Sequence, residues 1–132
     1  MKVAVVGSIR TNNFQDEQLV QKITNLWKEA SERLTNAEKS TYGVYHEYES
    51  NYKGDYSLSI ASEDTNGESF LEIPSNEKYK VFKVDPATEN SVFTTWQEIW
   101  AQEEAGTLKR SYTYDFEKYE PNGEINIYIA VK

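Results

Sequence analysis

The sequence predicts one α+β domain of two βαββ modules in a pseudo-twofold arrangement, with an antiparallel sheet, two helices on one face and a central groove. An amphipathic helical stripe occurs twice, and each stripe follows a β-prone run and precedes two more. The length of 132 residues is a common size for one domain. We therefore expect a single domain over residues 1–132, with repeat halves at about 1–65 and 66–132.

The first half opens with a β-prone run at residues 2–9 and a polar segment at 10–13 that is expected to be a loop. A helical stripe follows, with Asp16 as the expected N-cap. Two further β-prone runs, 41–50 and 55–62, flank a turn that contains Gly54 and so predict a hairpin. The stripe consists of Leu19, Ile23, Leu26, Trp27, Ala30 and Leu34.

The second half repeats this order after a polar connection at residues 63–69. A strand is predicted at 78–84, and the second helix is expected to begin with Ser91 or Thr88 as its cap and to stop at Gly106. Strands at 110–119 and 124–131 flank a turn in which Asn-Gly supplies positive φ angles. The second stripe consists of Val92, Phe93, Trp96, Ile99 and Trp100.

A module with one helix cannot cover its sheet alone, so the two modules are expected to join side by side. Their strands then form one continuous antiparallel sheet, and their helices flank a groove. The low mean hydropathy of -0.76 is compatible with a packed core, because three Trp, ten Tyr and five Phe are far more than a disordered chain contains.

Composition restricts the classes of function. The formal charge of -8 repels phosphate backbones, so direct nucleic-acid binding by this chain is not expected. The absence of cysteine excludes disulfides, thiolate catalysis and Cys-ligated metal. No apolar run approaches the ~18 residues that a membrane span needs. We expect a soluble cytoplasmic protein.

Strong catalytic signatures are absent: the sequence has no P-loop, dinucleotide fingerprint, His-Glu-x-x-His motif or nucleophile elbow. His46 is the only histidine, which excludes a histidine triad or a His-rich metal site. It is interpreted as an ordinary hairpin residue. No cofactor or metal is expected. Any enzymatic chemistry has to use carboxylates, tyrosines and hydroxyls.

Three tryptophans, Trp27, Trp96 and Trp100, lie on the inward stripes of the two helices. They are either ordinary core residues or the walls of a cleft in which flat aromatic faces hold a planar or cationic ligand. Three indoles and ten tyrosines exceed what a core of this size needs, which favours the cleft.

Glu117 is the unusual residue of the aromatic run 112–119, which is expected near the middle of the sheet. Strict alternation places it on one face with Thr113, Asp115 and Tyr119, without showing which face meets the helices. It is either a solvated or Arg-paired carboxylate, or a buried charge in an aromatic pocket that selects ligands bringing a positive charge.

With these segments placed, the chain resembles the gyrase-inhibitor-like effector-binding superfamily, and most closely its stand-alone branch, the integron-associated effector-binding proteins. None of the shared motifs is specific alone, but their order and spacing are. They are Arg10-Thr11-Asn12, Leu26-Trp27, Val44-Tyr45, Tyr48-Glu49-Ser50, Gly54-Asp55-Tyr56, Ile73-Pro74, Lys78-Tyr79, Val81-Phe82, Trp96 with Ile99-Trp100, Asp115-Phe116-Glu117 with Tyr119, and Ile127-Tyr128-Ile129.

The resemblance implies a central groove whose glutamate receives cationic drugs, and Glu117 occupies the matching position. The expected partner is thus a cationic aromatic small molecule. The ligand-binding residues that we predict are Glu117, Trp27, Trp96, Trp100, Tyr45 and Tyr119. Many relatives carry a helix-turn-helix region that this chain lacks, so transcriptional control would need a separate regulator or protein partner.

Two alternatives remain beside binding. Some relatives are similar to hydrolases that open strained cyclopropane rings with a glutamate and a tyrosine, which makes Glu117 and Tyr119 candidate catalytic residues. Other relatives, the gyrase inhibitors, suggest a module that holds a macromolecular partner. We favour small-molecule binding, because an acid–base pair requires a geometry that spacing alone does not supply.

Overall fold

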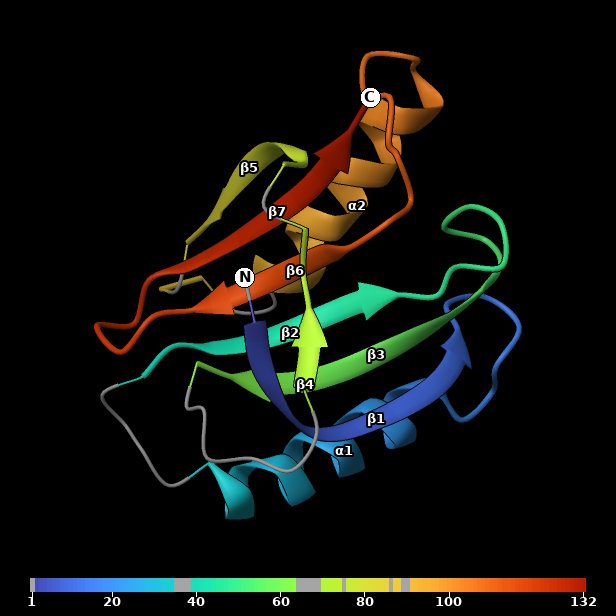
Figure 1. Ribbon diagram of the computed structural model, residues 1–132. Helices are drawn as coiled ribbons and strands as arrows, with labels where there is room; N and C mark the ends of the chain where they lie inside the picture. The colour runs from blue at the N-terminus through green and yellow to red at the C-terminus, as the bar shows by residue number, and fades with distance from the viewer. Residues whose placement is uncertain (1, 35–38, 64–69, 75, 86, 89–90) are drawn as a thin grey trace.

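The computed structural model describes residues 2–34, 39–63, 70–74, 76–85, 87–88 and 91–132 (Figure 1). Its seven strands form one sheet in the order β4-β1-β3-β2-β6-β7-β5, and every described pair is antiparallel. The elements along the chain are β1 (Lys2–Asn12), α1 (Leu19–Arg33), β2 (Thr41–His46), β3 (Asp55–Ser62), β4 (Phe70–Glu72), β5 (Lys78–Val84), α2 (Ser91–Glu104), β6 (Asp115–Tyr119) and β7 (Ile125–Val131).

The strand order confirms the two-module α+β fold. The first module contributes β1-β3-β2 and the second contributes β6-β7-β5, and the two meet at the β2–β6 seam. Counted outward from the seam, each module places its second strand first, then its third, then its first. The central pair runs from Thr41 opposite Tyr119 to Tyr45 opposite Asp115. This arrangement is pseudo-twofold about an axis between β2 and β6.

Both helices pack on the same face of the sheet, each over its own module (Figure 1). Leu26 and Ala30 of α1 pack on Leu58 and Ile60 of β3. Ile99 of α2 belongs to the corresponding cluster over β5 and β7. Because each helix covers its own half, the strip of sheet along the seam is left between them.

The opposite face carries a second layer of apolar side chains. Phe116 of β6 stacks on Tyr128 of β7, with ring centroids 4.7 Å apart, and contacts Tyr42 of β2. Val3 of β1 and Ile73, just beyond β4, are buried in the same cluster. The sequence analysis did not predict β4, which pairs with residues 2–4 of β1. The sheet therefore carries buried apolar side chains on both of its faces.

Several predicted boundaries are confirmed and others are wrong. Strands 55–62 and 78–84 are confirmed as β3 and β5. Residues 10–12 were expected in a loop, but they continue β1 and pair with residues 55–57. The strand predicted at 41–50 ends at His46, because Glu47 has a φ of 53°. The strand predicted at 110–119 begins only at Asp115, since Tyr112 has a φ of 57°.

The helix ends also differ in part. Gln18, not Asp16, is the N-cap of α1, although the Asp16 carboxylate accepts a hydrogen bond from the Gln18 N–H at 2.9 Å. Ser91 is already inside α2, so it is not the cap; residues 89–90, just before the helix, lie outside the described part, and the alternative cap Thr88 is not tested. Gly106 is confirmed as the stop, with a φ of 78° and its N–H bonded to the Glu103 carbonyl. In the last hairpin Gly123 alone has positive φ, whereas both Asn122 and Gly123 were expected to.

Candidate ligand-binding pocket

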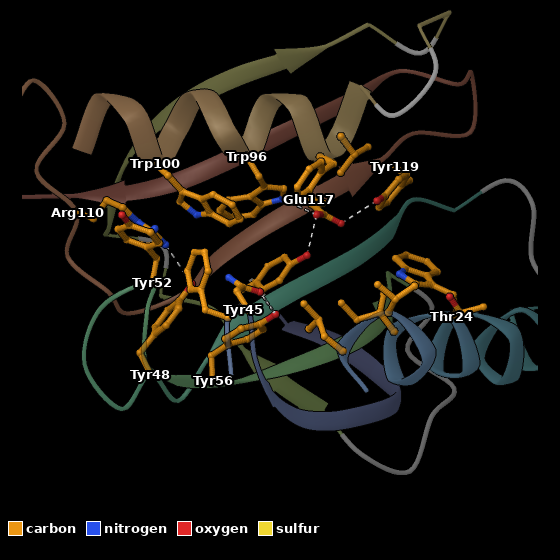
Figure 2. Close-up of a pocket in the computed structure, with 18 residues that line it drawn as sticks. Thr24, Tyr45, Tyr48, Tyr52, Tyr56, Trp96, Trp100, Arg110, Glu117 and Tyr119 are labelled. Carbon is orange, nitrogen blue, oxygen red and sulfur yellow. Dashed lines mark hydrogen bonds between the residues drawn. The ribbon is translucent and has the colours of Figure 1, made fainter. Parts of the chain in front are cut away.

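A cavity of about 480 Å³ lies over the seam between α1 and α2 (Figure 2). It is walled by both helices, floored by β2, β3 and β6, and bounded at one end by the segment between β1 and α1. Its lining residues are Asn13, Phe14, Leu19, Val20, Ile23, Thr24, Trp27, Tyr45, Tyr48, Tyr52, Tyr56, Val92, Phe93, Trp96, Trp100, Arg110, Glu117 and Tyr119.

Glu117 lies at the centre of this cavity and is only 3% exposed. Its Oε2 accepts hydrogen bonds from the Tyr45 hydroxyl at 2.8 Å and from Trp96 Nε1 at 2.7 Å. Its Oε1 accepts one from the Tyr119 hydroxyl at 2.7 Å. The donors come from β2, α2 and β6, so one carboxylate ties three elements together across the seam (Figure 2).

The electrostatic state of Glu117 results from two opposing effects. Burial raises its pKa above the usual value of 4.5, while the hydrogen bonds from Trp96, Tyr119 and Tyr45 oppose that rise. All three donors are neutral, and no ion pair joins Glu117 to a cationic side chain within the described residues. The pocket thus contains a carboxylate that is hydrogen-bonded but not neutralised.

The two tyrosines are held as hydrogen-bond donors. Burial, first, and then the charge of Glu117 raise the pKa of Tyr119 and of Tyr45 well above 10. Both phenols therefore keep their protons across the physiological range and point them at the carboxylate. Their oxygens remain neutral, so within this hydrogen-bonded group the charge belongs to Glu117.

Gly43 of β2 makes room for that carboxylate. It is paired directly with Glu117 in the sheet, and a Cβ at position 43 would lie 3.1 Å from Glu117 Oε1 and 3.5 Å from the Trp27 ring. Ordinary contacts to a Cβ are longer than 3.4 Å. A side chain at this position would push the carboxylate or the indole toward the cavity, so the bare backbone of Gly43 fixes the depth of the site.

Arg110 lines the far end of the cavity, but its charge is already compensated. Its Nη2 lies 2.7 Å from Asp115 Oδ2, and its Nη1 lies 3.4 Å from Glu103 Oε1. The Tyr48 hydroxyl donates to the same Asp115 oxygen at 2.5 Å. Because Asp115 is fully buried beside it, this guanidinium is not available to Glu117. The two charged groups of the cavity therefore act separately.

Aromatic rings form most of the wall. Trp27 meets Tyr119 edge to face at a centroid distance of 5.2 Å, and Tyr45 meets Trp96 in the same way at 4.9 Å. At the other end, Trp100 is stacked on a tyrosine ring: the Tyr52 and Trp100 centroids lie 5.6 Å apart at 13°. The cavity thus offers π faces on several sides of Glu117.

The mouth of the cavity is apolar and open. Phe14 is 58% exposed, Val20 of α1 is 76% exposed and Phe93 of α2 is 55% exposed. Phe14 also contacts the rings of Tyr52 and Trp100, so the first module reaches across to α2 at this end. Apolar side chains that gather around an opening are typical of a surface that an apolar ligand covers.

The structure brings all six predicted ligand-binding residues to this one cavity: Trp27, Trp96, Trp100, Tyr45, Tyr119 and Glu117. Asp115, Glu117 and Tyr119 share the helix-facing side of β6, as alternation required. Tyr112 lies outside the strand and contacts Glu103 and Arg110. His46 faces the other side, where its ring stacks on Tyr114 and its Nε2 is hydrogen-bonded to Ser59.

Sequence reasoning missed other lining residues. Tyr56 alternates with Leu58 on β3, a pattern that would have placed it on the helix face. Ile23 lies one turn before Trp27 on the same stripe. Phe14, Tyr52 and Arg110 carried no such signal, because they lie outside helices and strands and reach the cavity only through the folding of their loops.

No group of His, Cys, Asp and Glu in the described part of the chain is arranged to hold a metal ion. No described helix has the length and apolarity to cross a membrane.

Comparison with known proteins bears directly on this pocket. The model of the Cass2 family, described as integron-associated effector-binding proteins, matches residues 2–131. The chain belongs to this family. Membership in the integron-associated effector-binding proteins indicates a small-molecule ligand for the domain, and it confirms the resemblance seen in the sequence.

A solved structure supports the same conclusion. The chain is similar to the integron cassette protein VCH_CASS2 from the mobile metagenome of Vibrio cholerae, with a TM-score of 0.80 and 29% sequence identity. The alignment covers 100% of this chain and 90% of the Vibrio protein. No curated protein matches the chain. This integron-associated effector-binding protein and the Vibrio protein therefore have the same fold over the whole length of the chain described here.

The contact between Gly43 and Glu117 can be tested by a double-mutant cycle. Gly43→Ala should lower the free energy of unfolding by about 1–3 kcal/mol through overpacking, although alanine in a strand otherwise stabilises by about 0.5–1 kcal/mol relative to glycine. In a Glu117→Ala background the cost should disappear, because the crowded oxygen is gone. Urea unfolding of the four proteins measures the coupling, and equal costs in both backgrounds would contradict this account of Gly43.

Proposed function

We propose that the protein binds an amphipathic aromatic cation in the pocket between α1 and α2, with the cationic group against Glu117. The observation that carries this proposal is a buried carboxylate that receives three hydrogen bonds from neutral donors and, among the described residues, has no cationic partner. A buried carboxylate without an opposite charge is costly, and a ligand that supplies that charge removes the cost.

The surroundings of Glu117 support an aromatic body on the ligand. A cation within about 6 Å of a tryptophan or tyrosine face gains about 0.5–2 kcal/mol. The Trp27–Tyr119 and Tyr45–Trp96 pairs both flank the carboxylate, so such a cation meets charge and π faces together. The apolar mouth at Val20 and Phe93 would cover the uncharged part of the ligand.

The overall charge of the protein favours the same class of ligand. With 14 basic and 22 acidic residues the formal charge is -8, and this field raises the local concentration of cations around the molecule. It acts on the rate of encounter rather than on the final contacts. Selectivity for cations then depends on Glu117, which lies where the ligand is desolvated.

The first test is a titration of tryptophan fluorescence with planar aromatic cations, such as a rhodamine-type dye, and with neutral and anionic aromatics of similar size. Trp96 donates to Glu117 directly, so binding should quench its emission. Only the cations should quench saturably. Glu117→Gln should weaken their binding by about 30-fold or more, as expected when one partner of a buried charge pair is removed.

Glu98→Gln is the matched control, because Glu98 is an exposed acid of α2 and the substitution changes the net charge equally. Its affinity for the dye should equal that of the unmodified protein. Equal weakening by both substitutions would mean that only the overall field matters. Unchanged affinity in Glu117→Gln would refute the role assigned to the carboxylate.

Binding of a permanently charged cation should also depend on pH. Since burial raises the pKa of Glu117 above 4.5, the carboxyl becomes neutral at a higher pH than an exposed glutamate would. A cation prefers the ionised form, so its affinity should be constant at high pH and fall as pH decreases through that raised pKa. Dissociation constants measured between pH 8 and pH 5 check this, and Glu117→Gln should show a flat profile.

Hydrolysis of an electrophilic ring is a second candidate, favoured by one observation. The Tyr119 hydroxyl and Glu117 Oε1 lie 2.7 Å apart within the cavity, as an acid and a base that share a proton would. Glu117 would take a proton from water as the water oxygen bonds to a ring carbon. The strained ring bond would break, Tyr119 would protonate the departing carbon, and Glu117 would return a proton to Tyr119.

The test is incubation of the protein with cyclopropane-containing alkylating compounds, followed by chromatography of the ring-opened product. If the site is catalytic, Tyr119→Phe and Glu117→Gln should each lower the turnover rate by 100-fold or more, about the contribution of one acid–base group, while binding of the substrate persists in Tyr119→Phe. Absence of product above the uncatalysed rate would leave the protein as a binder.

A further inference from the structure

We infer that the cation accepted by this pocket carries few N–H donors: a quaternary ammonium, a pyridinium-type ring or a delocalised dye cation, with at most one N–H, rather than a primary ammonium or a guanidinium. The inference rests on the proposed function and deepens it. It follows from the number of hydrogen-bond acceptor positions that Glu117 still has free.

An ionised carboxylate has about four lone-pair positions. Among the described residues three donors occupy positions on Glu117: the Tyr45 hydroxyl and Trp96 Nε1 on Oε2, and the Tyr119 hydroxyl on Oε1. One position, on Oε1, is left for a ligand. A primary ammonium brings three N–H donors and a guanidinium brings five, so most of them would lose their water and find no carboxylate oxygen.

Other acceptors around the cavity do not make up the difference. Asn13 Oδ1 accepts the Tyr56 hydroxyl at 2.5 Å and, as a neutral amide oxygen, has one lone pair left. The Asp115 carboxylate receives Arg110, Tyr48 and the N–H of Ala130, and it is fully buried and does not line the cavity. The oxygens of Tyr45 and Tyr119 keep lone pairs, but they are neutral and replace water less well than a carboxylate does.

The walls favour the same kind of cation. Around Glu117 the side chains of Trp27, Trp96, Tyr45 and Tyr119 present rings, and rings attract a charge that is covered by methyl groups or spread over an aromatic system. A cation without N–H groups loses little hydration on entry and still neutralises the carboxylate. Charge and aromatic surface together replace the hydrogen bonds that the site does not offer.

The test uses one aromatic body with four head groups: biphenylmethyl-trimethylammonium, the dimethylammonium, the primary ammonium, and the uncharged neopentyl analogue. Dissociation constants are measured at pH 7 by tryptophan fluorescence and calorimetry. We expect the trimethylammonium and dimethylammonium compounds to bind within about threefold of each other. The primary ammonium should bind at least tenfold more weakly, and the neutral analogue most weakly.

A variant tests the acceptor count itself. Tyr119→Phe removes the donor on Oε1 and frees a second acceptor position, so the affinity of the primary ammonium relative to the trimethylammonium should rise at least threefold. Tyr128→Phe is the control, because Tyr128 packs on Phe116 on the opposite face. It should leave that ratio unchanged. A general loss of packing would weaken all ligands together and could not produce the change in ratio.

The outcomes separate this inference from the proposed function. If the primary ammonium binds as tightly as the trimethylammonium while the neutral analogue binds weakly, the preference for N–H-poor cations is wrong and the cation pocket stands. An unchanged ratio in Tyr119→Phe would also overturn the acceptor argument. If the neutral analogue binds as tightly as the cations, or none of the four compounds binds, the proposed function fails and this inference fails with it.

Discussion

The structure depends on one constraint: a carboxylate is buried at the seam between two modules and is held there by neutral donors. Tyr45 belongs to the first module, while Trp96 and Tyr119 belong to the second. Glu117 is therefore one of the links between the two halves, beside the β2–β6 pairing and contacts such as that of Phe14 with Trp100. Its geometry cannot change without moving side chains from both modules, which keeps the charge in one place although none of the described residues supplies a counter-ion.

The cavity exists because the two helices serve different halves of the sheet. The α1 cluster lies over β3 and the α2 cluster over β5 and β7, and Tyr45 of β2 packs against both at the seam. The opposite face has its own cover, with Phe116 packed under Val3 and Ile73. Trp96 and Tyr56 belong to these clusters and also line the cavity, so the walls of the site are part of the core.

How far the sequence predicted these features depended on the range of the interactions. Periodicity placed β3, β5 and both helices, because alternation and helical spacing are local. It failed at residues 110–114, where the buried pair between Arg110 and Asp115 and the positive φ of Tyr112 interrupt the strand. It also missed β4, whose three residues are too few to show a pattern and whose pairing partner is β1.

The site divides in the same way. Trp27, Trp96 and Trp100 were predicted from the helical stripes, whereas alternation left the face of Glu117 open and the family resemblance supplied its place in the groove. Phe14 and Tyr52 were not predicted, since each enters the cavity from a loop and meets Trp100 only in the folded chain. The role of Gly43 was also invisible in the sequence: its meaning comes from the register that sets it against Glu117.

The contrast between the two buried carboxylates of β6 supports the proposal that Glu117, and not Asp115, receives the charge of the ligand. Asp115 and Glu117 are two residues apart on the same face, and both are almost fully buried. Asp115 is matched by Arg110, whose guanidinium lies 2.7 Å away, so its charge is satisfied inside the protein. Glu117 is matched by hydroxyls and an indole, which stabilise a negative charge without cancelling it. Because Arg110 is already bound to Asp115, the attraction that Glu117 retains is available to a cation from outside.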